Sequence, residues 1–272
     1  MCFDMYKNVE VSTEDDMYFL RLFAEYDHTA GQSVQLKYEK TEIQDQERLT
    51  RTLGLEALKK DEDEITKISE LKYWAVQNLS FKGEMVKTRE YDFLDCLDII
   101  QKAKADRYAL NCRYITLVFT QILLTMGFKA RPVCCMSMDL RDTECHWVTE
   151  VYINQLRKWI VVDVPLDFFY FDTKGNLLNL IEMRRLIVKG EDIRLISTNR
   201  EHILFAQQYW RKNIFRFKFL EVNRYNMLLS KDKHYLVLNP RGFLMRNKKI
   251  INERDVVQVS YYYDERLFWG EC

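Results

Sequence analysis

The segment from Asn111 to Asp163 constrains the fold more than any other part of the chain, because it places one amphipathic helix directly before a series of strands. Apolar residues recur every three or four positions after Cys112, which is the period of one helix face. Gly127 is suited to end this helix and Asn111 to cap its beginning. The spacing therefore predicts a helix over 112–126, with Cys112 in phase with the apolar face at its N-terminal end. That face is formed by Ile115, Val118, Phe119, Ile122, Leu123 and Met126.

Three candidate strands follow, over 130–138, 145–153 and 158–162. The loop between the last two is either residues 154–157 or only the two residues at its centre. Both choices keep the same parity, so Asp163 is expected opposite Val148. His146 and Asp163 then share one face of the sheet, one diagonal step apart. At roughly 7 to 8 Å between backbones, an imidazole and a carboxylate can reach each other.

The other segments alternate between helical and strand patterns. Residues 17–24 are apolar without a decisive period, and residues 33–38 alternate as a strand with one wet face does. Residues 166–170 are apolar and aromatic, and they precede a turn at 172–176. No internal repeat is seen in the sequence. Further helices are predicted over 42–53, 65–79, 92–104, 181–187 and 201–213, and further strands over 215–222, 235–238 and 255–263. This set of elements predicts an α+β fold.

Composition excludes several classes of protein. The chain has 272 residues, of which 47% are hydrophobic, so it is long enough to bury a full core. Its 41 basic residues balance 41 acidic ones, so we expect neither nucleic acid nor an anionic membrane as a partner. No apolar run approaches the roughly 18 residues that a membrane span needs, and no signal peptide is expected. These features predict a cytoplasmic protein, or a secreted or surface-attached one if a targeting segment is missing from the sequence.

The seven cysteines are an odd and scattered set, so a disulfide framework is not expected and a reducing compartment is favoured. No Cys-x-x-Cys pair occurs, and we expect no metal and no cofactor. Cys134, Cys135 and Cys145 could form a soft metal site with His146, but thiols buried in strands are the simpler interpretation.

Cys112, His146 and Asp163 together have the composition of a nucleophilic site. A helix N-terminus carries partial positive charge, which favours the thiolate, and its free N–H groups can bind an oxyanion. A histidine can act as the base, and an aspartate can orient it. Each of these residues, taken alone, more often has a structural role. Such a cysteine usually packs in the core, such a histidine has its hydrogen bonds made within the strand, and such an aspartate begins a loop. Their order on compatible elements favours the catalytic interpretation.

These residues are similar to the core of the transglutaminase-like superfamily, whose papain-like fold places a catalytic Cys on a helix and His and Asp on neighbouring strands. The resemblance covers roughly residues 65–190. The chain departs from the usual pattern in three ways: Ala109-Leu110-Asn111 precedes the cysteine without a glycine, Trp147 follows His146 directly, and Val164 separates Asp163 from Pro165. The matching motifs are the helix after Cys112, Gly127-Phe128-Lys129-Ala130-Arg131, His146-Trp147-Val148-Thr149-Glu150-Val151 and Trp159-Ile160-Val161-Val162-Asp163.

The resemblance implies a transglutaminase-like, papain-like core with the catalytic helix packed on an antiparallel sheet and extra elements at both ends. We expect a single domain over 1–272, with the core at 65–190 and a strand-rich extension of the same domain at 191–272. It also implies a cysteine hydrolase or acyltransferase, with Cys112, His146 and Asp163 as a triad that forms a thioester on a protein or peptide amide.

Two matters stay open at the level of sequence. Water as acceptor would give protease or deamidase activity, and an amine would give cross-linking; hydrolysis is preferred because nothing marks an amine or calcium site. The alternative is an inert module that keeps the fold for binding a protein or peptide. Arg107, Tyr108 and Asn111 are candidates for an auxiliary oxyanion side chain, and the oligomeric state is not predicted.

Overall fold

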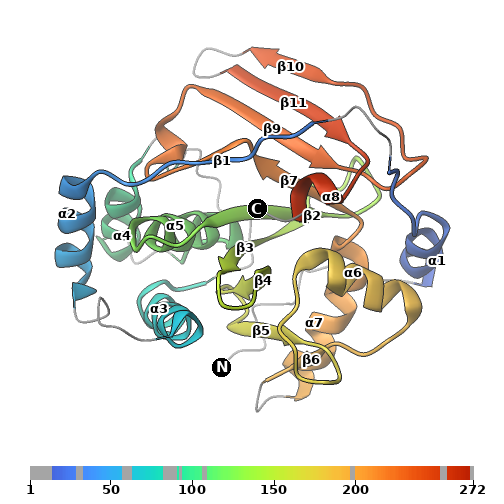
Figure 1. Ribbon diagram of the computed structural model, residues 1–272, viewed down its shortest axis with the longest axis horizontal. Helices are drawn as coiled ribbons and strands as arrows, with labels where there is room; N and C mark the ends of the chain where they lie inside the picture. Colours follow the sequence, from blue (N-terminus) through green and yellow to red (C-terminus); the bar gives the residue numbers. More distant parts are fainter. Residues whose placement is uncertain are drawn as a thin grey trace.

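The computed structural model describes residues 14–28, 33–56, 63–81, 91, 94–105, 109–196, 200–251 and 256–269. Within these residues a mixed sheet runs in the order β10-β11-β9-β7-β2-β3-β4-β5-β6 (Figure 1). The pair β9–β11 is parallel and the other pairs of this sheet are antiparallel. Its strands are β2 (Ala130–Met136), β3 (Cys145–Ile153), β4 (Lys158–Asp163), β5 (Phe168–Phe171), β6 (Arg194–Leu195), β7 (Arg216–Leu220), β9 (Asp232–Leu238), β10 (Lys248–Ile251) and β11 (Val256–Tyr262). Two shorter strands, β1 (Lys37–Tyr38) and β8 (Val222–Asn223), pair in parallel.

Helices lie on both sides of the central strands, so the fold is α+β as predicted (Figure 1). One apolar core joins α2, α3, α4 and α5 to one face of β2–β4, and a second joins α1, α6, α7 and α8 to the other face. The helices are α1 (Glu14–Leu22), α2 (Ile43–Leu53), α3 (Glu64–Asn78), α4 (Cys96–Ala105), α5 (Cys112–Thr125), α6 (Leu180–Lys189), α7 (Arg200–Asn213) and α8 (Arg266–Trp269), with a 3-10 turn at Met227–Leu229.

Helix α5 forms where its sequence predicts. The Asn111 side chain accepts a hydrogen bond from the Tyr114 amide at 3.1 Å, which caps the first turn. Gly127 follows the helix with a φ of 88°, a conformation that glycine adopts without steric cost. Every residue from Tyr114 to Thr125 is buried, because the helix packs on β2 and β3 and is covered by α2, α3 and α4.

The register of β3 and β4 confirms the predicted parity. Val151 pairs with Ile160 and Thr149 with Val162, so the next position along brings Asp163 opposite Val148. Residues 154–157 form the turn between the strands. The even length of this turn thus sets the faces on which His146 and Asp163 lie.

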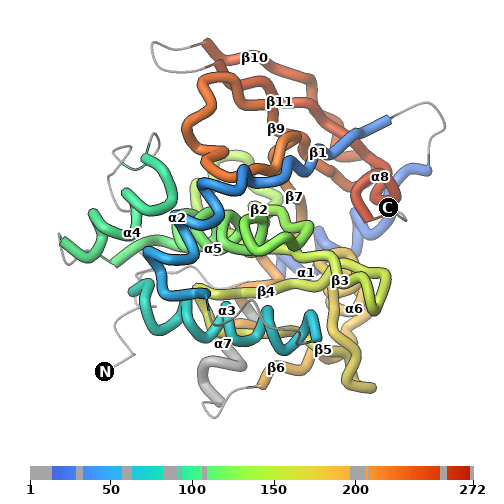
Figure 2. The backbone as a smooth tube through the Cα atoms, turned by 60° about the vertical axis from the view of Figure 1, so that its left-hand side comes forward, coloured from blue at the N-terminus to red at the C-terminus, as the bar shows by residue number. Residues whose placement is uncertain are grey.

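Strands β7, β9, β10 and β11 of the C-terminal part continue the sheet that contains β2 and β3 (Figure 2). Strand β7 pairs antiparallel to β2, with Cys134 opposite Lys218. The division of the chain into a core at 65–190 and an extension at 191–272 stays a prediction.

Some segments differ from their sequence patterns. Residues 17–24 fall mostly within helix α1, and only Lys37–Tyr38 of the expected strand at 33–38 is extended in a pair. The sequence did not indicate β6, β10 or α8, which are short and whose partners lie far away in the chain.

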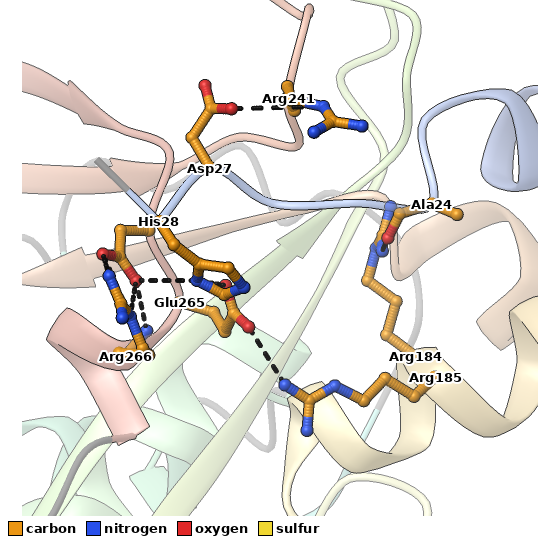
Figure 3. Close-up of polar contacts among 9 residues, drawn as sticks. Ala24, Asp27, His28, Arg184, Arg185, Arg241, Glu265 and Arg266 are labelled. Atoms are coloured by element: carbon orange, nitrogen blue, oxygen red, sulfur yellow. Dashed lines mark hydrogen bonds and ion pairs between the residues drawn. The ribbon is translucent and has the colours of Figure 1, made fainter.

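The stretch before β1 is fixed to the C-terminal end by polar contacts (Figure 3). The Asp27 amide donates to the Tyr263 carbonyl at 2.7 Å, and His28 Nδ1 lies 3.7 Å from Asp264. Ligand-type atoms of His28, Asp264 and Glu265 come within 4.8 Å of one another. Each carboxylate already has an arginine partner, since Arg266 pairs with Asp264 and Arg185 with Glu265. These charges are therefore balanced within the protein, and we assign the cluster to structure rather than to metal binding.

No helix in the described part of the chain has both the length and the apolar character needed to cross a membrane.

Candidate active site

Cys112 is the first residue of α5, and its side chain is partly exposed. The thiol lies 3.7 Å from the Cys145 carbonyl at the beginning of β3. Two further contacts hold this helix end against the strand: Thr116 Oγ1 donates to the Trp147 carbonyl at 2.8 Å, and the hydroxyls of Thr120 and Thr149 lie 3.0 Å apart. These contacts fix the position of α5, and so of the thiol at its N-terminus, relative to β3.

His146 and Asp163 are in direct contact. Nε2 of the imidazole lies 2.8 Å from Oδ2 of Asp163, and both side chains are buried. The Cys112 thiol is close enough to the ring to contribute to raising the pKa of His146. Because Nε2 is paired with the carboxylate, Nδ1 is the ring nitrogen left for the thiol. The structure therefore brings all three predicted residues together.

The surroundings keep the His146 ring charged. Burial by itself lowers the pKa of this imidazole, but the charge of Asp163 and the hydrogen bonds to Asp163 and Cys112 outweigh it and raise the pKa to about 10. Tyr209 and Trp210 of α7 pack edge-on against the ring, with centroids 5.4 and 5.3 Å away. These rings exclude water, which strengthens the attraction between imidazolium and carboxylate.

Asp163 is itself held by groups that the sequence did not single out. The Tyr170 hydroxyl donates to Oδ2 at 2.5 Å, and the Leu166 amide donates to Oδ1 at 3.2 Å. Trp210 Nε1 in turn donates to the Tyr170 oxygen at 2.8 Å. Burial, with the charge of Asp163, raises the pKa of Tyr170 well above its usual range, so the phenol stays a donor. Tyr170 lay within a predicted apolar run and Trp210 on a predicted helix, and neither pattern marked a polar role.

Replacing Tyr170 by Phe is expected to lower the free energy of unfolding by about 1–3 kcal/mol, because the buried Trp210 N–H loses its acceptor and Asp163 loses a donor. Urea denaturation measures this change. Tyr73→Phe is the matched control, since Tyr73 is 67% exposed and should tolerate the same deletion. Equal effects of the two substitutions would contradict the role assigned to Tyr170.

The other strand cysteines lie close to this centre. Cys134 and Cys135 are buried and Cys145 is partly buried. The neighbouring Cys134 thiol, opposed by burial and helped by Lys218, lowers the pKa of Cys145 to about 6, whereas burial raises that of Cys134. Cys135 pairs with His146 across the sheet and belongs to the core beside α6 and α7. Cys96 lies in the opposite core, which contains α4 and α5.

A second histidine is also hydrogen-bonded on both nitrogens. His234 Nδ1 lies 3.0 Å from Glu221 Oε2, and Nε2 lies 2.8 Å from Ser260 Oγ. Ser260 is 8% exposed and lies within β11 between buried Val259 and Tyr261. Its hydroxyl therefore has little access to a substrate, and the arrangement satisfies the imidazole within the sheet.

The oxyanion candidates remain unassigned. Arg107 and Tyr108 lie outside the described residues. Asn111 uses its side-chain oxygen to cap α5.

Comparison with known proteins finds a family that this core resembles. Residues 51–164 match the family model of the transglutaminase-like superfamily, a range that contains Cys112, His146 and Asp163. This part of the chain is similar to that superfamily, and the α+β arrangement of its elements agrees with the fold that the sequence motifs predicted. No curated protein matches the sequence.

Two solved structures resemble the chain weakly. One is a "putative cysteine protease" from Cytophaga hutchinsonii, with 18% identity and a TM-score of 0.34 over 60% of this chain. The other is a "putative protease" from Parabacteroides distasonis, with 11% identity and a TM-score of 0.31 over 60% of this chain. The match spans 52% of the first protein and 30% of the second.

Proposed function

We propose that this protein is a cysteine-dependent acyl-transfer enzyme that acts on amide bonds of proteins or peptides. Cys112 is the nucleophile, His146 carries the proton and Asp163 orients the imidazole. The observation that supports this most is the 2.8 Å contact between His146 Nε2 and Asp163 Oδ2, with Cys112 near enough to the same ring to raise its pKa. This is the relation between nucleophile, base and orienting group that thiol catalysis requires.

The raised pKa of His146 assigns its part in the first step. At neutral pH the ring is an imidazolium, which can give a proton to the leaving group, and the nucleophile in this mechanism is the thiolate form of Cys112. The thiolate attacks the amide carbonyl, and the C–N bond breaks as His146 gives its proton to the departing amine. The product is a thioester on Cys112, and the imidazole is left neutral.

The second step completes the cycle. The neutral imidazole takes a proton from water, whose oxygen attacks the thioester carbonyl and releases an acid. The proton then remains on His146, and Cys112 returns to the thiolate. An amine in place of water would give transamidation by the same proton transfers. Hydrolysis is the proposed reaction, because no residue in the described part of the chain marks a second binding site for an amine.

Alkylation by iodoacetamide, located by peptide mapping, tests this proposal. At neutral pH we expect Cys112 to react roughly tenfold faster than free cysteine, because an unperturbed thiol is mostly protonated there. The advantage should shrink as free cysteine ionises and disappear as pH approaches the His146 pKa of about 10. His146→Ala should remove it at every pH. A Cys112 that reacts at the rate of free cysteine, unchanged by His146→Ala, would support the inert binding module instead.

A further inference from the structure

A cavity of about 160 Å³ adjoins the residues that hold Asp163. It lies between α1, α6 and α7, on the side of the sheet on which His146 packs (Figure 1). Its wall includes Tyr170 and Trp210, which are 0% and 1% exposed to solvent. Trp210 donates to the Tyr170 hydroxyl and that hydroxyl donates to Asp163, so a molecule in the cavity contacts the hydrogen-bond chain that supports the candidate active site.

The apolar part of the lining suits one hydrocarbon group. Ile187, Ile193 and Leu195 come from the end of α6 and from the region of β6, Met17 comes from α1, and all four line the space together with Trp210. An engineered cavity of about 150 Å³ in another protein binds benzene, so this volume is sufficient for a branched aliphatic side chain. Binding such a group here removes apolar surface from water and is therefore favourable.

Charged side chains of both signs also line the cavity. The cations are Arg21 of α1 and Arg211 of α7, and the acids are Glu191 and Asp192, which follow α6. Within the described residues neither arginine forms an ion pair with either acid, and the nearest cation to Glu191 is Lys189, at 4.0 Å. The described part of the lining thus holds two positive and two negative charges that are not paired with one another.

This balance of charges selects the class of ligand. A carboxylate alone would be attracted by the two arginines but repelled by Glu191 and Asp192, and an ammonium alone would meet the opposite combination. A zwitterion can form charge-assisted hydrogen bonds with both kinds of side chain at once. A zwitterion that also carries one hydrocarbon side chain is an apolar α-amino acid.

From this lining we infer that the cavity is a binding site for a free α-amino acid with an apolar side chain. The carboxylate pairs with Arg21 and Arg211, the ammonium pairs with the acids after α6, and the side chain packs against Trp210. Because Trp210 and Tyr170 support Asp163, the bound amino acid acts on the orientation of the His146 ring. The site goes beyond the proposed function and does not require Cys112 to be a nucleophile.

Isothermal titration calorimetry on the full chain tests the ligand class with three molecules that share the leucine side chain. L-Leucine carries both charges, 4-methylpentanoate only the carboxylate, and 3-methylbutylamine only the ammonium. We expect L-leucine to bind about tenfold or more tightly than either analogue, because each analogue lacks one set of charge-assisted hydrogen bonds. The affinity for L-leucine should fall as salt screens the exposed charges.

Variants assign each charge of the ligand to its partner. Arg211→Gln should weaken the binding of L-leucine and 4-methylpentanoate by about fivefold or more, but not that of 3-methylbutylamine. Asp192→Asn should weaken the binding of L-leucine and 3-methylbutylamine, but not that of 4-methylpentanoate. Arg194→Gln is the matched control and should leave all three affinities unchanged. Arg194 stands between two lining residues in the sequence, but its exposed side chain is not part of the lining, because strand residues alternate between faces.

The rate of alkylation of Cys112 by iodoacetamide measures the action on the candidate active site. Saturating L-leucine should change this rate by twofold or more in the unmodified chain, because the ligand contacts the residues that support Asp163 and pack on His146. The same concentration of L-leucine should have a smaller effect on Arg211→Gln.

The outcomes separate this inference from the proposed function. Absence of L-leucine binding, equal affinity for L-leucine and its analogues, or binding that neither variant weakens overturns the amino-acid site. Binding of L-leucine with an unchanged alkylation rate supports the site and overturns its action on Asp163. An unreactive Cys112 contradicts the proposed function, whereas the calorimetric result stands independently of it.

Discussion

Replacing Cys112 by Ala is expected to abolish acyl transfer, lowering the rate by about 10⁴-fold or more, because the thiol that forms the proposed thioester is lost. Release of ammonia or of new amino groups from a peptide library measures hydrolysis, and incorporation of a fluorescent primary amine measures transamidation. The same variant should trap no acyl group on the protein, which mass spectrometry detects. Loss of both activities together would be expected, since both pass through one thioester.

Cys145 provides the control that makes this result specific. It lies beside His146 in the sequence and has a pKa lowered to about 6, so it is the thiol best placed to act instead. Cys145→Ser should retain most activity, because Cys112 and not Cys145 stands at the N-terminus of α5, where the free N–H groups can bind the oxyanion. If Cys145→Ser were inactive and Cys112→Ala active, the nucleophile would be wrongly assigned and the N-terminus of α5 would have only a structural role.

Replacing Glu150 by Ala is expected to lower the free energy of unfolding by roughly 3–5 kcal/mol. Arg131 and Glu150 are both fully buried, and Arg131 Nη2 lies 2.7 Å from Glu150 Oε2. The other carboxylate oxygen accepts from the Leu180 amide at 3.0 Å and from Trp269 Nε1 at 2.9 Å. Without the carboxylate, the buried guanidinium loses its counter-charge and keeps its hydrogen bond to the Phe268 carbonyl, while the Leu180 amide and Trp269 Nε1 lose their acceptor.

Urea denaturation with a two-state fit measures this effect. Asp139→Ala removes one partner of the exposed Arg141–Asp139 pair and is the matched control, expected to change stability by at most about 0.5 kcal/mol. A small effect of Glu150→Ala would mean that water reaches Arg131 and that this pair does not fix β2, β3 and the beginning of α6 together. Because β2 and β3 carry Cys134 and His146, the stability of this pair bears on the candidate site as well.

The two faces of strand β3 pack against different helices. The face of β3 that carries His146 packs on α7, whereas Trp147 and Thr149 face α5. Alternation along one strand therefore places the imidazole beside Trp210 and the Trp147 indole on the face that packs against α5. A slip of one residue in the β3 register would exchange these faces and separate His146 from Asp163.

Much of the region from Asn111 to Asp163 was determined by local sequence. Cys112 falls at the start of α5 because Asn111 caps the helix and the apolar period begins with the residues after it. His146 meets Asp163 because the turn at residues 154–157 has an even length and both strands alternate. These are short-range rules of capping, periodicity and parity, and they apply before any tertiary contact is known. The family resemblance of these motifs agrees with the match over residues 51–164.

Only the tertiary structure decided what surrounds that centre. Tyr170 holds Asp163, Trp210 holds Tyr170, and Lys218 reaches Trp147, although these partners come from β5, α7 and β7. No local pattern marks these residues. The sequence around a tyrosine in an apolar strand, or around a lysine in an alternating strand, is the same whether or not the side chain contacts a charged or aromatic partner in the fold. Their positions depend on which strands pair over long separations in the chain, and such pairing is set by the packing of the whole sheet rather than by any one segment.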